Sequence, residues 1–180
     1  MKRILVVVLL SFSLHSLYCQ DSPVFYWNVG NVNVNYEALK NDWNVELNYA
    51  ELNWFLFNRI FLGVTVFKTM YDGDKTWYSL LPLEAGYQLS FPGSEYFHIR
   101  FYNRLEWQYR NLNSFTSSDS RLIDSVGAKL IIASKIDSLR YNCNFLALLF
   151  EYTNRNEFKI GMSVDLVVFF VIIGGLILEG

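Results

Sequence analysis

Apolar and polar residues alternate one by one along most of the chain beyond position 23, and this period of two constrains the fold more than any other feature. In residues 43–49, Trp, Val, Leu and Tyr share one parity, while two asparagines and a glutamate share the other. Residues 97–109 set mainly aromatic and aliphatic residues against His, Arg, Glu and Gln in the same way. Successive side chains of a β-strand point to opposite faces, whereas a helix would need a period of 3.6 residues. The pattern predicts an all-β protein built from amphipathic strands.

Short polar or glycine-containing segments divide the alternating runs, and seven such connections imply eight strands. We expect these strands at residues 24–36, 43–56, 60–70, 76–91, 95–110, 121–134, 140–152 and 156–170. Strands of soluble proteins usually have about 5–6 residues, whereas a tilted membrane strand needs about 9–11. Most of the expected strands reach that length. The sequence therefore predicts an eight-stranded antiparallel up-and-down transmembrane β-barrel.

The composition agrees with a wall that faces lipid. Apolar residues make up 52% of the chain and charged residues only 18%, so the chain has much apolar surface to bury. The best candidate for a spanning helix, residues 166–178, is shorter than the roughly 20 residues that such a helix needs.

The N-terminal residues have the pattern of a secretory signal peptide. Lys2 and Arg3 precede an apolar stretch, and residues 11–20 are smaller and more polar. We expect a signal peptide at 1–20 and one barrel domain at 21–180. Its removal would move the formal net charge from −2 to about −4, and this acidic balance argues against a nucleic-acid partner.

The apolar phase slips by one residue inside two of the expected strands. In residues 43–56 the slip falls near Ala50-Glu51, and in residues 140–152 it falls near Ala147–Leu149. A β-bulge inserts one residue and restores the original outward face. We therefore predict a β-bulge at each of these two places.

Aromatic residues lie mostly near the expected strand ends, as residues at the two membrane–water interfaces do. The expected girdle comprises Trp27, Trp43, Tyr49, Trp54, Trp77, Phe91, Phe97, Trp107 and Tyr109.

Residues 81–87, Leu-Pro-Leu-Glu-Ala-Gly-Tyr, resemble the mid-barrel strands of the small eight-stranded outer-membrane proteins of the OmpX and OmpA-barrel type. The resemblance extends over residues 24–170 and rests on pattern. It implies a lipid bilayer as the partner and the bacterial outer membrane as the location, and we expect a monomer. Members of this class usually end on an aromatic residue of the last strand, whereas here residues 171–180 follow Phe170.

The polar parity would fill the interior of such a barrel, which has room for side chains and little more. The predicted lumen ion network comprises Glu46, Glu84, His98, Arg100, Arg104, Glu106, Lys129, Lys159 and Asp165. A tight turn at Pro92-Gly93 would place Glu84 opposite a position near 100–102, so that it should meet Arg100, with Arg104 as a diagonal neighbour. We interpret the network mainly as structural neutralisation of buried charge. A narrow ion path is the alternative.

Catalysis would need a nucleophile and a base in contact. His98 is the one histidine beyond the signal segment, and we expect it inside the lumen without a serine neighbour. The sequence has no metal-ligand spacing, no P-loop and no dinucleotide fingerprint, so we expect neither catalytic residues nor a metal or cofactor.

The sequence is compatible with three functions. The first is a non-enzymatic structural or surface-interaction barrel that contacts ligands through loops 37–42, 71–75 and 111–120. The second is a porin-like passage for small solutes or ions. The third is a soluble, secreted, lipocalin-like carrier, in which the apolar parity would face an internal pocket instead of lipid.

Overall fold

The computed structural model describes residues 24–56, 59–91, 96–110, 120–136, 141–168 and 170. The predicted signal peptide (1–20), most of loop 111–120 and the tail 171–180 lie outside the described residues.

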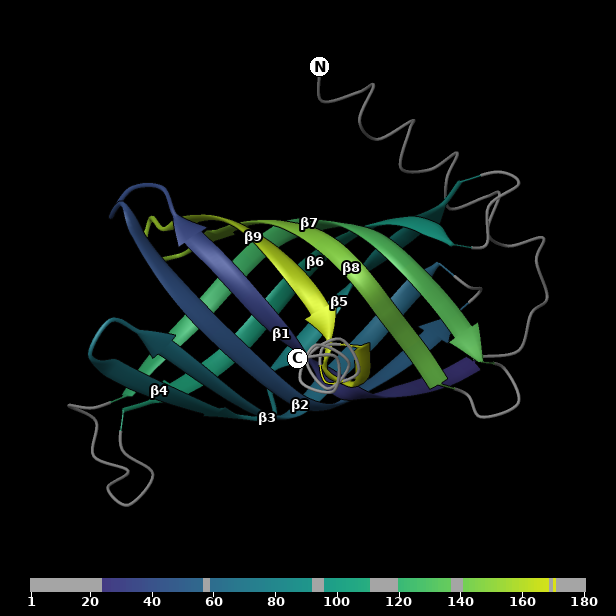
Figure 1. The fold of residues 1–180 in the computed structure, drawn as a ribbon, viewed down its shortest axis with the longest axis horizontal. Helices are drawn as coiled ribbons and strands as arrows, with labels where there is room; N and C mark the ends of the chain where they lie inside the picture. The colour runs from purple at the N-terminus through teal and green to yellow at the C-terminus, as the bar shows by residue number, and fades with distance from the viewer. Residues whose placement is uncertain are drawn as a thin grey trace, which may run out of the picture.

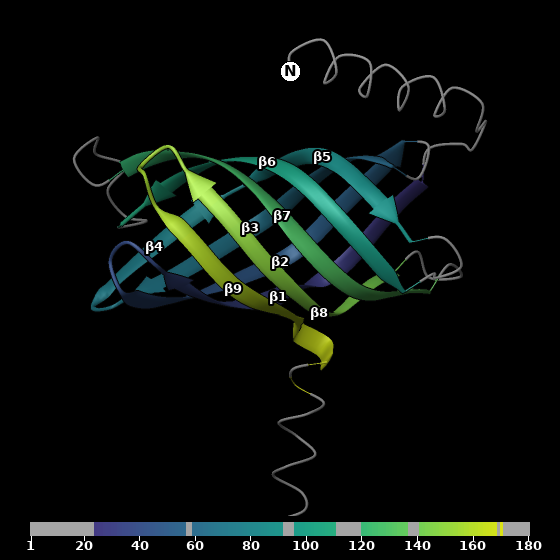
Figure 2. The same ribbon diagram turned by 90° about the horizontal axis from the view of Figure 1, so that it is seen from above.

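The described residues form one antiparallel ring of strands, as Figures 1 and 2 show. Each strand is hydrogen-bonded to the next along the chain, and the last strand pairs with the first. The exception is one interrupted strand, whose two parts β4 and β5 both pair with β3 on one side and β6 on the other. The strands are β1 (Val24–Glu37), β2 (Asp42–Leu56), β3 (Ile60–Asp72), β4 (Lys75–Leu80), β5 (Leu83–Ser90), β6 (Phe97–Tyr109), β7 (Ser120–Ile136), β8 (Tyr141–Thr153) and β9 (Phe158–Asp165). The predicted all-β, up-and-down barrel is confirmed.

The two ends of the barrel are distinguished by the connections that lie there. We call the end at which β1 begins the inner end. We call the opposite end, with the turns at 38–41, 73–74 and 154–157, the outer end.

The expected fourth strand, 76–91, is interrupted and forms both β4 and β5. Leu81 has a φ of 51°, which is unusual for a bulky side chain, and Pro82 cannot donate to a ladder. Against β6, Ser79 pairs with Gln108 but Leu83 pairs with Leu105, so this strand holds one extra residue there. This is a β-bulge that the sequence analysis did not predict.

The bulge reverses the faces of β4. Ser79 is almost fully buried, and Trp77 shares its parity. The guanidinium of Arg121 lies 3.8 Å from the centre of the Trp77 ring. The prediction that Trp77 belongs to the aromatic girdle on the outward face of the wall is therefore wrong, because a slip of one residue exchanges the two faces of a strand.

A second irregularity lies at Ala50, at the predicted position, but the predicted β-bulge is wrong: Tyr49 and Glu51 keep one register against both β1 and β3, so no residue is inserted. Ala50 has a φ of 53°, and the ladder between β1 and β2 skips the pair between Val29 and Ala50. Because β1 slips at the same level, the register of the two strands is unchanged. Gly30 has a φ of 134°, and a Cβ there would overlap the carbonyl oxygen of Asn48, so only glycine suits this position.

The predicted bulge near Ala147–Leu149 lies closer to the inner end than expected. Ile132 pairs with Leu146 while Ala133 pairs with Asn144, so Phe145 is the extra residue in β8. Ala147 faces the interior, where it packs with Ile131 and Ala133. The prediction counted Ala147 as outward by its apolar type, but a small apolar side chain also fits a crowded interior.

The last strand is shorter than predicted, because β9 ends at Asp165 instead of residue 170. Residues 166–168 and 170 belong to a helical turn, which lies outside the ring of strands in Figure 2. The Asp165 carboxylate accepts a hydrogen bond of 2.8 Å from the backbone N–H of Val167 and so caps this turn. Within the described part of the chain, no helix is long and apolar enough to span a membrane.

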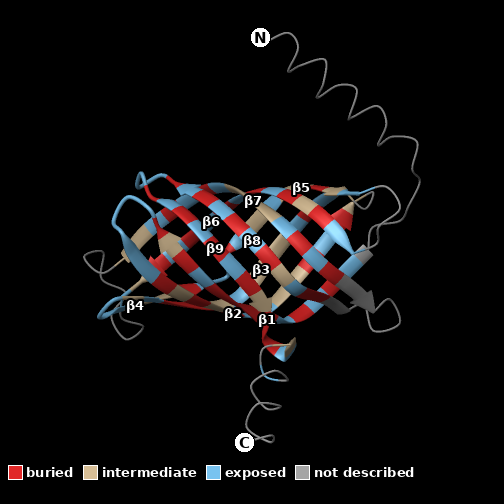
Figure 3. Cartoon of the chain, turned by 45° about the horizontal axis from the view of Figure 1, so that its top comes forward, coloured by how far each residue is buried: buried red, intermediate tan, exposed pale blue. Residues whose placement is uncertain are grey.

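The two faces of the wall have opposite chemistry. In Figure 3, buried and exposed residues alternate along the strands. Exposed residues on all nine strands include large apolar side chains such as Trp54, Phe101 and Phe150. Buried residues include many asparagines, glutamates, lysines and arginines. The interior of this barrel is thus its polar side.

Candidate functional site

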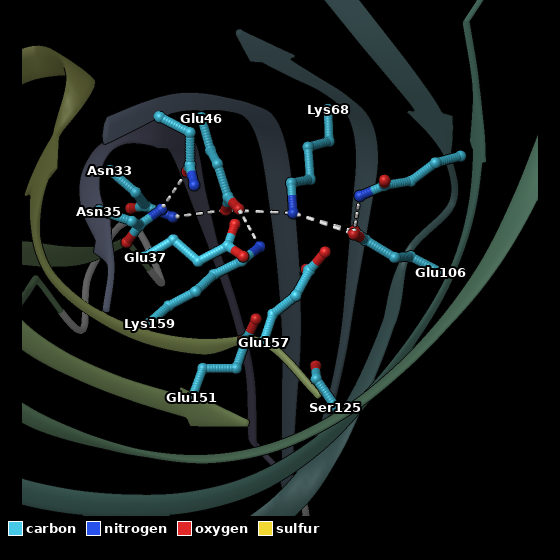
Figure 4. A network of polar contacts seen from close by, with 12 residues as sticks. Asn33, Asn35, Glu37, Glu46, Lys68, Glu106, Ser125, Glu151, Glu157 and Lys159 are labelled. Carbon is cyan, nitrogen blue, oxygen red and sulfur yellow. Dashed lines mark hydrogen bonds and ion pairs between the residues drawn. The ribbon is translucent and has the colours of Figure 1, made fainter. Parts of the chain in front are cut away.

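A cluster of buried ions around Lys68 fills the outer half of the lumen (Figure 4). Lys68 extends from β3, and its Nζ lies 3.1 Å from Oε2 of Glu46 on β2. The same Nζ lies 3.0 Å from Oε2 of Glu106 on β6. The Lys68 side chain is 1% exposed, so the two carboxylates supply the charge compensation that water cannot.

Arg104 and Lys159 extend this cluster to β8 and β9. Nη2 of Arg104 lies 2.7 Å from Oε1 of Glu151, which also accepts a 2.8 Å hydrogen bond from the Tyr102 hydroxyl at Oε2. Nζ of Lys159 lies 3.6 Å from Oε1 of Glu46. The cluster contains three carboxylates and three cations, whose formal charges cancel: Glu46, Glu106, Glu151, Lys68, Arg104 and Lys159. We call these six residues the central cluster.

Amide side chains surround the central cluster. Gln108 donates to Glu106 through Nε2 and accepts a hydrogen bond of 2.6 Å from Nε of Arg121. Asn33 donates to Glu46 at 3.5 Å. Because amides both donate and accept, they connect the ions to the strands without adding charge.

The inner half of the lumen is organised differently, around aromatic rings. Phe55 and Phe61 are buried there, and the guanidinium of Arg100 lies 5.5 Å and 4.5 Å from their ring centres. Nη2 of Arg100 donates to Oε1 of Gln88 at 2.9 Å. Arg100 is therefore held by cation–π contacts and a neutral amide.

The predicted pairing of Glu84 with Arg100 is wrong. Glu84 is opposite Arg104 in the ladder, and its carboxylate instead lies 2.7 Å from Nζ of Lys129 on β7. The prediction assumed a two-residue turn at Pro92-Gly93. The ladder pair nearest to this connection is in fact Ser90 with His98. The connection is therefore longer than a two-residue turn, and the register between β5 and β6 shifts by three residues.

The same register corrects the prediction for His98. Ser90 faces it directly, and the Ser90 Oγ lies 2.9 Å from Nδ1 of His98. His98 is buried in the lumen as expected, but the expectation that no serine accompanies it is wrong.

The structure thus divides the nine predicted network residues into separate groups. Glu46, Arg104, Glu106 and Lys159 belong to the central cluster. Glu84 and Lys129 form a separate pair in the inner half. Arg100 contacts the aromatic rings, His98 contacts Ser90, and Asp165 is fully buried where β9 ends.

Sequence reasoning missed Lys68 and Glu151. Lys68 is the one charged residue among residues 60–70, and a lone charge in an otherwise apolar barrel strand is a signal for an inward ion pair. The slip predicted in residues 140–152 already sets Glu151 on the polar parity, and the structure buries it there; only its membership of the network was missed.

A smaller ionic group closes the outer rim. Lys40, in the turn between β1 and β2, lies 2.8 Å from Oε1 of Glu37 and 2.7 Å from Oε1 of Glu157. Burial acts to raise the pKa of Glu157, but the hydrogen bond from Lys40 and neighbouring positive charges outweigh it, so that pKa lies below its ordinary value. Burial acts to lower the pKa of Lys40, but the two carboxylates hold it above its ordinary value.

Little space remains between the lumen side chains. One polar cavity of about 30 Å³ is lined by residues that include Asn31, Glu84 and Arg100. A second cavity, of about 10 Å³, lies against Glu46 and Arg104 of the central cluster. A single water molecule needs about 10–15 Å³, so these cavities fit only a few waters. No group of three His, Cys, Asp or Glu side chains that could hold a metal occurs among the described residues.

Comparisons with known proteins add little to this description. No protein-family profile matches the chain, and no curated protein matches it in sequence. The chain is similar to one solved structure described as "De novo design of transmembrane beta-barrels", with 16% sequence identity and a TM-score of 0.44. That similarity covers 81% of this chain and 98% of the designed chain.

Proposed function

We propose that this chain is a barrel embedded in the bacterial outer membrane, with a non-enzymatic structural or surface-interaction role and a sealed lumen. The observation that carries the proposal is the inverted distribution of polarity: large apolar side chains are exposed on all nine strands, while the buried side chains include many charged groups. A soluble domain of this size would place these residues the other way round. A barrel wall in lipid requires this arrangement.

The aromatic residues support two membrane–water interfaces. At the outer end, the rings of Tyr36 and Trp43 lie 5.2 Å apart, and those of Trp107 and Tyr109 lie 6.4 Å apart. At the inner end, Trp27, Trp54 and Phe97 are exposed on the outer wall. Membrane barrels have girdles of aromatic residues at both interfaces, where the amphipathic rings of Trp and Tyr favour the headgroup level, and these two groups lie at opposite ends of the strands.

The filled lumen supports a sealed barrel over a pore. The central cluster joins β2, β3, β6, β8 and β9 across the interior, and the two cavities between the lumen side chains fit only a few waters. A lipocalin-like carrier would need an open apolar pocket, whereas the interior here is filled by ions and amides in its outer half and by packed aromatic rings around Arg100 in its inner half. Any surface interaction would use the outer-end connections at 37–42, 71–75 and 111–120. The location rests on the signal-like residues 1–20 together with the apolar wall.

Depth-dependent substitution on the outer wall tests the proposal. Leu130 is exposed on β7 between Ile99 of β6 and Leu148 of β8, far from either rim, whereas Leu39 is exposed in an outer-end turn. Leu130→Lys should lower the free energy of unfolding in lipid vesicles by about 2–4 kcal/mol, and Leu39→Lys by about 0–1 kcal/mol. Denaturant titrations would measure both, with the gel mobility of unboiled samples reporting the folded barrel. Equal, small effects at the two positions would contradict a wall in lipid.

A further inference from the structure

Among the described residues, the ladders of the barrel wall are incomplete next to the end of β9. The ladder between β1 and β9 runs from Glu37 and Lys159 to Asn31 and Asp165. β1 extends a further seven residues toward the inner end, to Val24. β9 does not accompany it, because the chain turns into a helix after Asp165.

Beyond that point, β1 and β8 are direct neighbours but are hardly paired. In the described part of the chain, one parallel pair joins them, Trp27 with Tyr141. By contrast, the ladder between β1 and β2 continues without interruption from Gly30 to Glu37. Lipid offers backbone groups no hydrogen-bond partners, so a spanning wall is stable only when its ladders are complete. We call this place, between residues 24–30 of β1 and 141–146 of β8, the gap.

The segment after Asp165 is suited to a strand. Leu166, Val167, Val168 and Phe170 are apolar, and β-branched and aromatic residues favour strands over helices. The side chain of Leu166 lies beside β1, because its Cδ1 is 3.0 Å from the point that a Cβ on Gly30 would occupy.

We propose that this gap is a docking site for the chain's own residues 166–172, which extend β9 antiparallel to both β1 and β8. The register of the observed ladder sets residue 166 beside Gly30 and residue 172 beside Val24, so seven residues complete the wall. Fifteen residues follow Asp165, and none is charged before Glu179. Docking opens the single pair between Trp27 and Tyr141 and forms two antiparallel ladders in its place.

The inference rests on the proposed function, since lipid supplies the driving force to complete the wall. Disulfide cross-linking of the full chain in lipid vesicles tests it, in a background with Cys19→Ser and Cys143→Ser. The continued register places residue 171 beside Phe25, so Phe25→Cys with Val171→Cys should cross-link efficiently under mild oxidation. Phe25→Cys with Leu178→Cys places the second cysteine in the same C-terminal segment but off the proposed register, and should cross-link at least tenfold less.

Two further variants keep the result interpretable. Val34→Cys with Met162→Cys lies within the observed ladder and should cross-link in any folded barrel, whether or not it lies in a membrane. Val168→Pro is compatible with the first turn of a helix but removes a ladder donor, so it should abolish the cross-link between 25 and 171. Equal yields for the 171 and 178 pairs, or a yield unchanged by Val168→Pro, would overturn the docking. Failure of the Leu130→Lys comparison would instead overturn the membrane location.

Discussion

The two halves of the lumen are filled by different kinds of contact. In the outer half, the six ions of the central cluster compensate one another across five strands. In the inner half, Phe55, Phe61 and Tyr26 pack as rings, and Arg100 lies against two of them. Loss of one ion leaves a buried charge without compensation, whereas loss of one packing contact has a graded cost. We therefore expect a substitution in the outer half to lower the free energy of unfolding more than a substitution in the inner half.

The boundary between the halves coincides with the slip at Gly30 and Ala50. On the outer side of the slip, the inward residues of β2 are Asn44, Glu46 and Asn48. On the inner side they are Asn53 and Phe55. A slip of one residue changes which parity faces inward, so two strands can line both a charged and an aromatic compartment.

Among the variants that compare the two halves, Lys68→Met should have the largest effect on the free energy of unfolding. It leaves Glu46 and Glu106 buried without the cation between them, and it should lower the free energy of unfolding by about 3–5 kcal/mol. Lys129→Met is the matched control, because its partner Glu84 lies in the inner half and its side chain is 18% exposed. Denaturant unfolding in micelles, followed by tryptophan fluorescence, measures both. An equal loss in the two variants would refute the difference between the halves.

Arg100→Met should have an intermediate effect. It removes the guanidinium from the rings of Phe55 and Phe61 and leaves Gln88 without its donor, but the Glu84–Lys129 pair stays intact. We expect a loss of about 1–2 kcal/mol in the same unfolding measurement. A loss as large as that of Lys68→Met would mean that Arg100 is also part of an ion network.

The rim should show the smallest effect, together with a defined pH dependence. Glu157→Gln removes the partner of Lys40, whose side chain is 50% exposed, and should cost about 0–1 kcal/mol at pH 7. Because the pKa of Glu157 is lowered by folding, its ionised form stabilises the barrel above the ordinary value of 4.5, and this contribution is lost as the pH falls below it. The difference between the wild-type chain and Glu157→Gln should therefore vanish in acid. A difference that grows as the pH falls would contradict the ion pair.

The sequence by itself determined the barrel and, where a strand has no slip, the face of each residue. β6 is the clearest case: His98, Arg100, Arg104 and Glu106 were all expected inside, and all four are buried. Strict alternation suffices there, because the period of a strand is the same as the period of the pattern. The slip near Ala50 was located for the same reason, since it is visible in the order of apolar residues, but the predicted β-bulge was wrong because the neighbouring strands slip together with β2.

Only the tertiary structure decided which charges meet. Lys68 reaches the central cluster because β3 changes its inward parity near the irregularities at Ala50 and Leu81, and its own sequence does not mark that change clearly. Glu84 meets Lys129, and Ser90 meets His98, because the connection after β5 sets the register. Alternation fixes a residue's face, but partners depend on register, and register depends on connection lengths and on closure of the ring.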